Sequence, residues 1–241
     1  MVQNNNGAGM PFSGKCISIL GDSISTFAGY IPDGNRPRYP DSENPRCDVR
    51  DVHLTWWMRL IDRLDAYLGI NESWAGSCVG NCESYDHDDV GPGAAMASVR
   101  RIRNLGANGI PDVILFFGGT NDKLLPYPVG AFDPLNAPDG AEFDAVCWDT
   151  FADAYTAAVL RIRAMYPQAC LLCILPSDYG RQLDASYNVQ MRAVCKHYGI
   201  PHVILSCLTT DMLYDGYHPV ADAMALMADM IRQQLMMLVS K

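Results

Sequence analysis

The chain has 241 residues, of which 49% are hydrophobic and 19% are charged, the balance of a globular protein with a sizeable core rather than of a disordered one. Its 18 Lys and Arg residues against 27 Asp and Glu residues give a formal net charge of -9. This excess of acid opposes binding to nucleic acids and to anionic membranes, because both require clustered basic side chains. No stretch approaches the roughly 18 consecutive apolar residues of a membrane span. We therefore expect no nucleic-acid partner and no stable membrane insertion; the oligomeric state is left open.

The first residues, MVQNNNGAGMPFSGK, contain no apolar segment of the kind that a signal peptide needs. We expect residues 1–14 to be a flexible N-terminal segment and residues 15–241 to form a single domain. As the chain is given, this start predicts a cytoplasmic protein. If a signal peptide has been removed, the same Asn- and Gly-rich start suits a secreted or periplasmic protein.

Short apolar runs alternate with amphipathic stretches along the chain. The apolar runs predict buried strands at 16–20, 113–117, 171–175 and 203–205, with a weaker candidate at 67–71. The amphipathic stretches predict helices at 56–67, 96–105, 151–166, 186–198 and 221–238. Such alternation is typical of a parallel sheet covered on both faces. The sequence thus predicts a three-layer α/β/α sandwich with a central parallel sheet of about five strands.

Two long segments interrupt this alternation, at 26–51 and 123–143. Both are rich in Pro, Asn, Asp and Gly, with Tyr, Phe and Arg among them. Structureless loops of this length are uncommon in compact domains and are usually functional. Both follow expected strands, so we expect them at the carboxyl edge of the sheet, where open α/β proteins bind ligands. A variable surface excursion without a function is the alternative.

A serine stands at the first expected strand-to-helix turn, in Gly21-Asp22-Ser23. At such a turn the hydroxyl group lies at the rim of the sheet, and the backbone N–H lies beside the start of a helix, which favours a developing anion. The motif alone is also that of a surface turn with a capping serine.

An acid and a histidine lie three residues apart near the carboxyl end, in Asp215-Gly-Tyr-His218. Over one helical turn this spacing lets the carboxylate reach the imidazole. A carboxylate in that place fixes the imidazole tautomer and stabilises the imidazolium that forms when histidine accepts a proton. The motif alone is also consistent with an ordinary helix N-cap and a nearby histidine.

Two further polar segments follow expected strands. Gly118-Gly-Thr-Asn-Asp122 comes after the most apolar strand, and its Asn121 amide is able to donate a hydrogen bond to an oxyanion. Asn71-Glu-Ser-Trp-Ala-Gly76 follows the weak strand, and Gly76 offers a backbone N–H. Because parallel strands end at one edge, these groups are expected to meet there although nearly the whole chain separates them.

These four segments together resemble the blocks of SGNH/GDSL hydrolases: GDS, a glycine after the second strand, GxND after the third and DxxH before the last helix. The resemblance runs from Cys16 to Pro219 in the order of the family. It implies a flavodoxin-like hydrolase fold and an ester-cleaving activity without a cofactor or metal. Ile24 stands where the name GDSL has leucine, an apolar exchange. The G-x-S-x-G turn of α/β-hydrolases is missing from the sequence.

The resemblance also implies a role for each matching residue. Ser23 is the expected nucleophile, His218 the general base and then acid, and Asp215 its orienting partner. The expected oxyanion hole combines the N–H groups of Ser23 and Gly76 with the side chain of Asn121. Gly76 is assigned by N-x-S-x-x-G spacing alone, and Gly80 stands nearby.

The nine cysteines are an odd number and so cannot all pair in a disulfide framework. Cys170 and Cys173 form a CxxC inside an apolar strand, whereas a redox CxxC opens a helix, so we expect free, hydrophobic thiols. Cys78 and Cys82 have no histidine pair beside them, which disfavours a zinc site. The run Asp86-His-Asp-Asp89 offers metal ligands, but consecutive residues rarely converge on one ion.

Aromatic and basic residues in and after the first long segment are open to two interpretations. Of Trp56 and Trp57, one indole is expected in the core, while the other is a candidate to line the pocket, where rings stack on sugars. For Arg36 and Arg38, solvated loop charges are favoured over an anion site. His53 and His202 have no acid at a useful spacing and are expected to be structural.

The favoured function is cleavage of a short-chain or acetyl ester, on a carbohydrate or another small substrate, through an acyl-enzyme. Polar, aromatic loops favour a sugar-like substrate over a long lipid chain. A lysophospholipase or thioesterase acting on lipid acyl groups, acyl transfer to an acceptor other than water, and a non-catalytic carbohydrate-binding module on the same fold remain the alternatives.

Overall fold

The computed structural model describes residues 11–80, 95–125, 127–140, 148–176, 186–206 and 208–240. Its centre is a five-stranded parallel sheet with strand order β2-β1-β3-β4-β5. The strands are β1 (Cys16–Gly21), β2 (Tyr67–Ser73), β3 (Val113–Phe117), β4 (Cys170–Leu175) and β5 (His202–Ile204). The five-stranded parallel sheet expected from the sequence is thereby confirmed.

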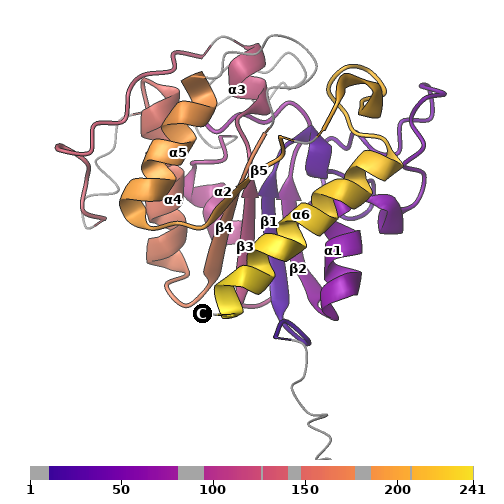
Figure 1. The fold of residues 1–241 in the computed structure, drawn as a ribbon, viewed down its shortest axis with the longest axis horizontal. Helices are drawn as coiled ribbons and strands as arrows, with labels where there is room; N and C mark the ends of the chain where they lie inside the picture. The colour runs from indigo at the N-terminus through magenta and orange to yellow at the C-terminus, as the bar shows by residue number, and fades with distance from the viewer. Residues whose placement is uncertain are drawn as a thin grey trace, which may run out of the picture.

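Helices cover both faces of the sheet, as Figure 1 shows. One face carries α1 (Trp56–Leu64) and α6 (Ala221–Val239), which pack on each other. The other carries α2 (Val99–Asn104), α4 (Phe151–Met165) and α5 (Ser186–Tyr198). The three-layer α/β/α sandwich is therefore confirmed.

Alternating side chains of the central strands supply the two cores. In β3 the side chains of Val113, Leu115 and Phe117 join the core under α1 and α6, while Ile114 and Phe116 join the core under α4 and α5. All five are fully buried or nearly so. Successive side chains of a strand point to opposite faces, so a strand covered on both sides must be apolar throughout.

Two helices are shorter than the sequence analysis expects. Helix α1 ends at Leu64 rather than at residue 67, because Asp65 adopts a left-handed conformation with φ 54° and the chain re-enters the sheet at Tyr67. Helix α2 begins after Ser98, whose hydroxyl caps it by accepting the N–H of Arg101. Apolar spacing marks which face is buried, while such local caps decide where a helix begins and ends.

Short helical turns occupy the carboxyl edge of the sheet, at the top of Figure 1. These are η1 (Ser23–Ser25), α3 (Thr120–Leu124) and η4 (Thr210–Met212), while η2 (Val52–Leu54) precedes α1. The segments that carry the candidate chemistry leave the sheet at this edge, as expected from the parallel strand order.

The two long loops take different paths. Residues 26–51 lie over the β1 end of the carboxyl edge, where Tyr39 is fully buried and donates its hydroxyl hydrogen to the carbonyl of Pro219. The described residues 127–140 run beside α4 and α5 on the other side of the molecule (Figure 1). There Phe132 packs on Tyr198, which donates a hydrogen bond to Pro138. The second loop thus begins at the carboxyl edge, where the Tyr127 ring lies against Gly80, and then leaves that edge along α5.

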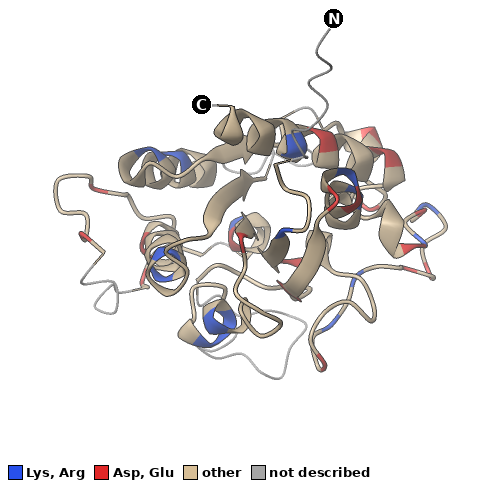
Figure 2. Cartoon of the chain, turned by 90° about the horizontal axis from the view of Figure 1, so that it is seen from below, with Lys and Arg blue, Asp and Glu red and all other residues tan. Residues whose placement is uncertain are grey.

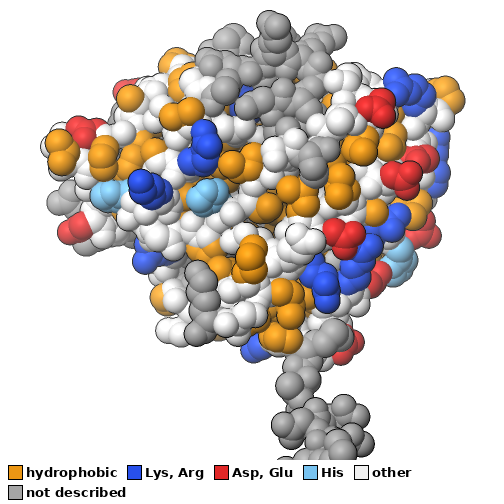
Figure 3. All heavy atoms as spheres, viewed as in Figure 1, with side chains coloured by type: hydrophobic (Ala, Val, Ile, Leu, Met, Phe, Trp, Pro, Cys, Tyr) orange, Lys and Arg blue, Asp and Glu red, His pale blue; other side chains and the backbone are white. Residues whose placement is uncertain are grey.

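The surface carries both charge types and scattered apolar groups. Figure 2 shows the basic segments as short stretches with acidic segments between them. Figure 3 shows hydrophobic side chains interspersed with polar and charged ones on the face that bears α6, where Met237 and Val239 are exposed. Singly exposed apolar side chains are ordinary on a protein surface. Among the described helices, none has the length and apolar character required to cross a bilayer.

The strand cysteines behave as the sequence analysis expects. Cys170 and Cys173 are free thiols in β4, and Cys173 is fully buried. Burial raises the pKa of both thiols, which keeps them protonated and unreactive. Cys82 and the run 86–89 lie outside the described residues. Within the described ranges, no three His, Cys, Asp or Glu side chains gather in a way that would hold a metal ion.

Candidate active site

Ser23 lies immediately after β1, in the turn that opens the carboxyl edge. The chain leaves the sheet at Gly21, where an added Cβ would come within 2.6 Å of the Ser73 hydroxyl oxygen, so only glycine fits. Asp22 caps the turn by accepting the N–H of Ile24 at 3.0 Å. The Ser23 side chain thus stands at the rim, while its residue is only 8% exposed.

The acid and the histidine lie in a tight bend rather than in the helical turn that the sequence analysis expects. An isolated bridge between Leu213 and Pro219 closes this bend, and Gly216 turns it with φ 91°. The Asp215 carboxylate accepts the backbone N–H groups of Tyr217 at 3.1 Å and of His218 at 2.9 Å. These bonds orient the carboxylate toward the imidazole of the same bend.

Ser23, His218 and Asp215 form one continuous hydrogen-bonded chain. The Nε2 atom of His218 lies 2.8 Å from the Ser23 Oγ, and its Nδ1 lies 2.7 Å from the Asp215 Oδ2. The sheet therefore brings together the three residues that the sequence analysis predicts, across 195 positions between Ser23 and His218. A serine hydroxyl, an imidazole and a carboxylate in this order have the geometry of a hydrolase triad.

The Asp215 carboxylate is held in its ionised form. Burial by itself raises its pKa, but the hydrogen bond and charge of His218 outweigh burial, and the backbone N–H groups of His218 and Tyr217 add to them. The pKa of Asp215 therefore lies well below its ordinary value. A carboxylate that stays charged stabilises a neighbouring imidazolium without taking its proton.

Two tyrosine rings fix the imidazole plane. The His218 ring stacks on Tyr214, with ring centres 5.7 Å apart and an angle of 28° between the planes. It meets Tyr39 edge-on at 6.2 Å. Both tyrosines are buried. Because rings on two sides restrict its rotation, His218 is held where both of its nitrogens have a partner.

Asn121 stands on the other side of the rim, in the first turn of α3. Its side-chain amide donates to the carbonyl of Ser77 at 2.8 Å, which ties it to the loop after β2. An amide carries two hydrogens, so the second is available to an oxyanion. The next residue, Asp122, is fully buried and accepts the backbone N–H groups of Val79 at 2.9 Å and Gly80 at 3.1 Å.

The two candidate glycines differ in their backbone hydrogen bonding. The N–H of Gly80 is already donated to Asp122. Gly76 has φ 83°, a left-handed conformation suited to glycine. In the part of the chain that the structure describes, no hydrogen bond uses the backbone N–H of Gly76 or of Ser23. The sequence-based choice of Gly76 over Gly80 is therefore the one compatible with this bonding.

Arg101 is a structural part of the site that the sequence analysis missed. It is fully buried on α2 and donates to the carbonyls of Glu72 at 2.7 Å and Gly21 at 3.2 Å, and also to the Ser77 hydroxyl. Burial lowers its pKa to about 10, so the guanidinium stays charged. It thereby joins the ends of β1 and β2 to the Gly76 loop. A basic helix such as VRRIRN looks solvated in sequence, which hides this residue.

Burial removes one open alternative about nearby residues, and two expectations are wrong. Trp56 and Trp57 are both fully buried, so neither indole lines a pocket. His53 has an acidic partner after all, because its Nδ1 lies 2.8 Å from Asp62, nine positions away. Arg38 is not a solvated loop charge: it bonds to Asp215 at 2.7 Å and to Asp41 at 3.0 Å.

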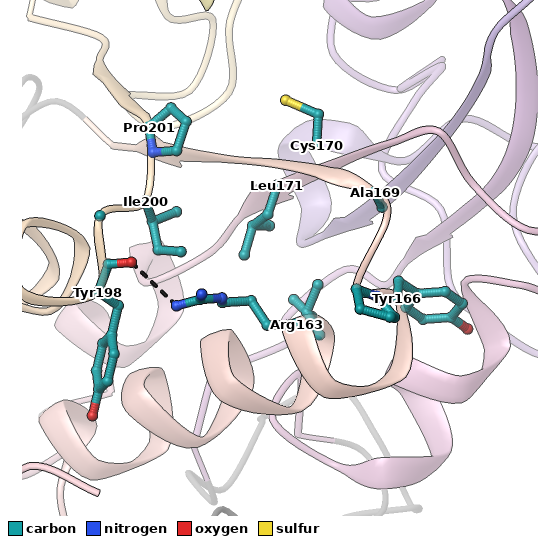
Figure 4. A pocket seen from close by; sticks show the side chains of 11 residues that line it. Arg163, Tyr166, Ala169, Cys170, Leu171, Tyr198, Ile200 and Pro201 are labelled. Carbon is teal, nitrogen blue, oxygen red and sulfur yellow. Dashed lines mark hydrogen bonds between the residues drawn. The ribbon is translucent and has the colours of Figure 1, made fainter. Parts of the chain in front are cut away.

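A hollow of about 290 Å³ opens at the opposite, amino edge of the sheet. It lies where α4 and α5 end and β4 begins, and Figure 4 shows Arg163 in it donating to the carbonyl of Tyr198 at 3.1 Å. The candidate catalytic residues follow the carboxyl ends of the strands. This hollow is therefore separate from the Ser23 rim.

Comparison with known proteins gives this geometry a family context. The family model of GDSL-like lipases and acylhydrolases matches residues 15–235. The chain belongs to this family. It is accordingly an ester-hydrolysing enzyme, as the sequence analysis predicts. No curated protein sequence matches this GDSL-like hydrolase.

Solved structures resemble this GDSL-like hydrolase over nearly its whole length. A protein from Bacteroides uniformis named as a GDSL-like lipase is 29% identical with a TM-score of 0.70, covering 94% of this chain and 96% of that one. A second, from Bacteroides ovatus, is 28% identical with a TM-score of 0.68, covering 95% and 99%. An aryl esterase of M. smegmatis shares the fold at 17% identity, with a TM-score of 0.64 over 93% of this chain and 100% of that one.

Proposed function

We propose that this GDSL-like hydrolase cleaves a short-chain or acetyl ester of a carbohydrate or another small substrate through an acyl-enzyme on Ser23. The observation that carries the proposal is the chain of contacts from Ser23 Oγ to His218 Nε2 at 2.8 Å and from His218 Nδ1 to Asp215 at 2.7 Å. Residues 15–241 are proposed to act as one catalytic domain.

In the first half-reaction, the Ser23 Oγ attacks the ester carbonyl carbon while His218 Nε2 takes the hydroxyl proton of Ser23. The carbon–oxygen π bond opens, and its electron pair settles on the former carbonyl oxygen. Asp215 stabilises the imidazolium. The intermediate collapses, the bond to the leaving alkoxide breaks, and His218 returns the proton to that oxygen, leaving an ester on Ser23.

The oxyanion of this intermediate is proposed to bind three donors, namely the backbone N–H groups of Ser23 and Gly76 and the Asn121 amide. Each is already oriented by the surrounding structure: η1 fixes Ser23, and the Asn121–Ser77 bond joins the other two. Donors that need no rearrangement stabilise developing charge most effectively. In the second half-reaction, water attacks the acyl-enzyme by the same route, and the acid and Ser23 are released.

A short acyl group fits the polar character of the covering loop. Near the site, residues 26–51 contribute Asn35, whose side chain donates to the carbonyl of Ser73 at 3.1 Å, and the charged Arg38. Such a loop offers little apolar surface to a long acyl chain. A related fold occurs in a family two carbohydrate esterase of Clostridium thermocellum in complex with cellohexaose, 17% identical with a TM-score of 0.60. This likeness concerns the fold, and the choice of substrate rests on the loop.

The test compares kcat/KM for acetate, butyrate and octanoate esters of p-nitrophenol, together with acetylated sugars. Each methylene buried in an apolar channel contributes about 0.8 kcal/mol, almost fourfold per carbon. A fall in kcat/KM from acetate to octanoate supports the short pocket. A steady rise to octanoate favours the lipid acylhydrolase, and sugar binding without turnover favours the carbohydrate-binding module. Ser23→Ala serves as the control for background hydrolysis.

A further inference from the structure

Arg38 connects two parts of the active site that come from opposite ends of the chain. Its backbone N–H donates to the Thr26 hydroxyl at 2.7 Å, and that hydroxyl donates to the carbonyl of Ser23 at 2.8 Å. Its side chain reaches Asp215 at 2.7 Å. One residue therefore touches both the turn of the serine and the carboxylate behind the histidine.

The guanidinium of Arg38 has its own fixed partners. Its Nε donates to the Tyr214 hydroxyl at 2.8 Å, and one terminal nitrogen lies 3.0 Å from Asp41. The same guanidinium lies over the Tyr214 ring, 5.5 Å from its centre. A planar group held at several edges loses little further freedom when it orients a carboxylate.

With the bond from Arg38, every acceptor site of the Asp215 carboxylate receives a hydrogen bond. Its Oδ2 accepts from His218 and from Arg38, each at 2.7 Å. Its Oδ1 accepts two backbone N–H groups. A carboxylate has about four lone-pair sites, so every site is used, and rotation would break several bonds at once.

Resting on the proposed function, we propose that Arg38 is a positioning residue that locks Asp215, and through it His218, in line with Ser23. Arg38 contacts the Asp215 carboxylate, and it acts on the reaction only through that carboxylate. Its positive charge also lies behind the imidazole, where it opposes formation of the imidazolium. Arg38 thus sets the alignment of the base and places a fixed positive charge behind it.

Charged or polar groups from three segments lie around His218 and Arg38. They are Ser23 from η1, Arg38, Tyr39 and Asp41 from the covering loop, and Tyr214 and Asp215 from its own bend. Arg38 is the cation among these six. Its removal leaves the negative charge of Asp215 beside the imidazole and leaves Asp41 without the guanidinium that it pairs with.

The experiment compares Arg38→Met with Arg50→Met in the full chain, using p-nitrophenyl acetate. Arg50 lies in the same loop, and its side chain donates to the carbonyls of Asp41 and Asn44, so it controls for a general loosening of the loop. We expect Arg38→Met to lower kcat about 10–100-fold with KM within about twofold, because a small misplacement of a catalytic group has this effect. The acidic limb of kcat/KM should move to higher pH. Arg50→Met should retain both values.

Arg38→Lys tests the charge separately from the geometry. A lysine keeps the positive charge but lacks the planar fork, so we expect the acidic limb to stay in place while kcat recovers only in part. Asp41→Asn is the milder second variant should Arg38→Met fail to fold. It frees one edge of the guanidinium, and we expect a smaller loss of kcat with unchanged KM.

One readout is independent of turnover. The hydrogen-bonded Nδ1 proton of His218 should give a low-field NMR signal that moves or broadens in Arg38→Met and stays in place in Arg50→Met. An unchanged signal, kcat within twofold of wild type, or a loss confined to KM would each overturn the positioning role. A wild type that hydrolyses no ester would refute the proposed function instead, and the NMR comparison would still decide the role of Arg38.

Discussion

The two walls of the Ser23 rim are held in different ways. On the base wall, Asp215 and His218 lie in a bend pinned by the side chain of Arg38, which is 34% exposed. On the oxyanion wall, Asn121 and Gly76 are joined through Ser77, and the fully buried Asp122 holds the same loop by its backbone.

In the proposed mechanism, this contrast follows from the different tasks of the two walls. The base must carry a proton from Ser23 to the leaving oxygen, so its neighbours act through the charge that they place beside the imidazole. The oxyanion wall offers fixed hydrogen-bond donors, so its neighbours act by holding the backbone of the donor loop in place. We therefore expect changes on the base wall to alter the rate and its pH dependence, and changes beneath the oxyanion wall to alter folding as well.

The largest effect is expected from the base wall. His218→Ala removes the group that takes the serine proton and should lower kcat by about 10⁴-fold or more. Asp215→Asn should lower it less, since part of the base function survives without the carboxylate. Steady-state kinetics with p-nitrophenyl acetate measures both. A near-normal kcat in His218→Ala would refute the assignment of this wall.

Removing the Asn121 amide comes next. One oxyanion donor typically contributes about 10²–10³ to kcat, and Asn121→Ala should show this loss with little change in KM. A change mainly in KM would mean that Asn121 binds the substrate in its ground state, which would contradict its proposed role as an oxyanion donor.

Asp122→Ala should separate stability from rate. It leaves the buried N–H groups of Val79 and Gly80 without their acceptor, and each unsatisfied group reduces stability by about 1–3 kcal/mol. We expect the free energy of unfolding to fall by about 2–5 kcal/mol in denaturant titrations. Asp133→Ala is the control, because Asp133 bonds only to the exposed Leu135 and Asn136. Equal stability of the two variants would contradict the structural role of Asp122.

The smallest effect concerns the pH dependence of stability. The pKa of Asp215 is depressed in the folded state, so its ionised form stabilises the fold above its ordinary pKa of about 3.9. This stabilisation is lost as the pH falls through the depressed value. The difference in Tm between wild type and Asp215→Asn should therefore be largest near neutral pH and shrink toward pH 2. A difference that is constant with pH would contradict the ion-pair network of the base wall.

The sequence predicted the parts of the molecule that depend on short patterns. The continuous apolar run of β3 and the spacing of α5 indicated strand and helix because burial imposes those periods directly. Ser23, Asn121 and His218 followed because parallel strands end at one edge. Their positions needed only the residues themselves and the order of the elements, whereas the roles of Ser23, Asn121 and His218 rested on the resemblance to SGNH/GDSL hydrolases.

The contacts between distant loops could not be predicted in the same way. Arg38 finds Asp215 across 177 positions, and His53 finds Asp62 across the start of a helix. Nothing in the local pattern of a charged loop residue distinguishes a solvated side chain from one that meets an acid in space. Arg101 was missed for the same reason, since a helix rich in arginine looks exposed until its neighbours are known.

The most direct test of the central assignment is the site at which the enzyme becomes acylated. Wild type is treated with a fluorophosphonate, a reagent that captures activated serine hydroxyls, and the modified peptide is identified by mass spectrometry beside Ser23→Ala and Ser25→Ala. Ser25 is the matched control because it lies in the same turn and is fully buried. The proposed mechanism predicts modification of Ser23, no labelling of Ser23→Ala and retained labelling of Ser25→Ala. Undiminished labelling of Ser23→Ala, or an adduct at another residue in wild type, would contradict it.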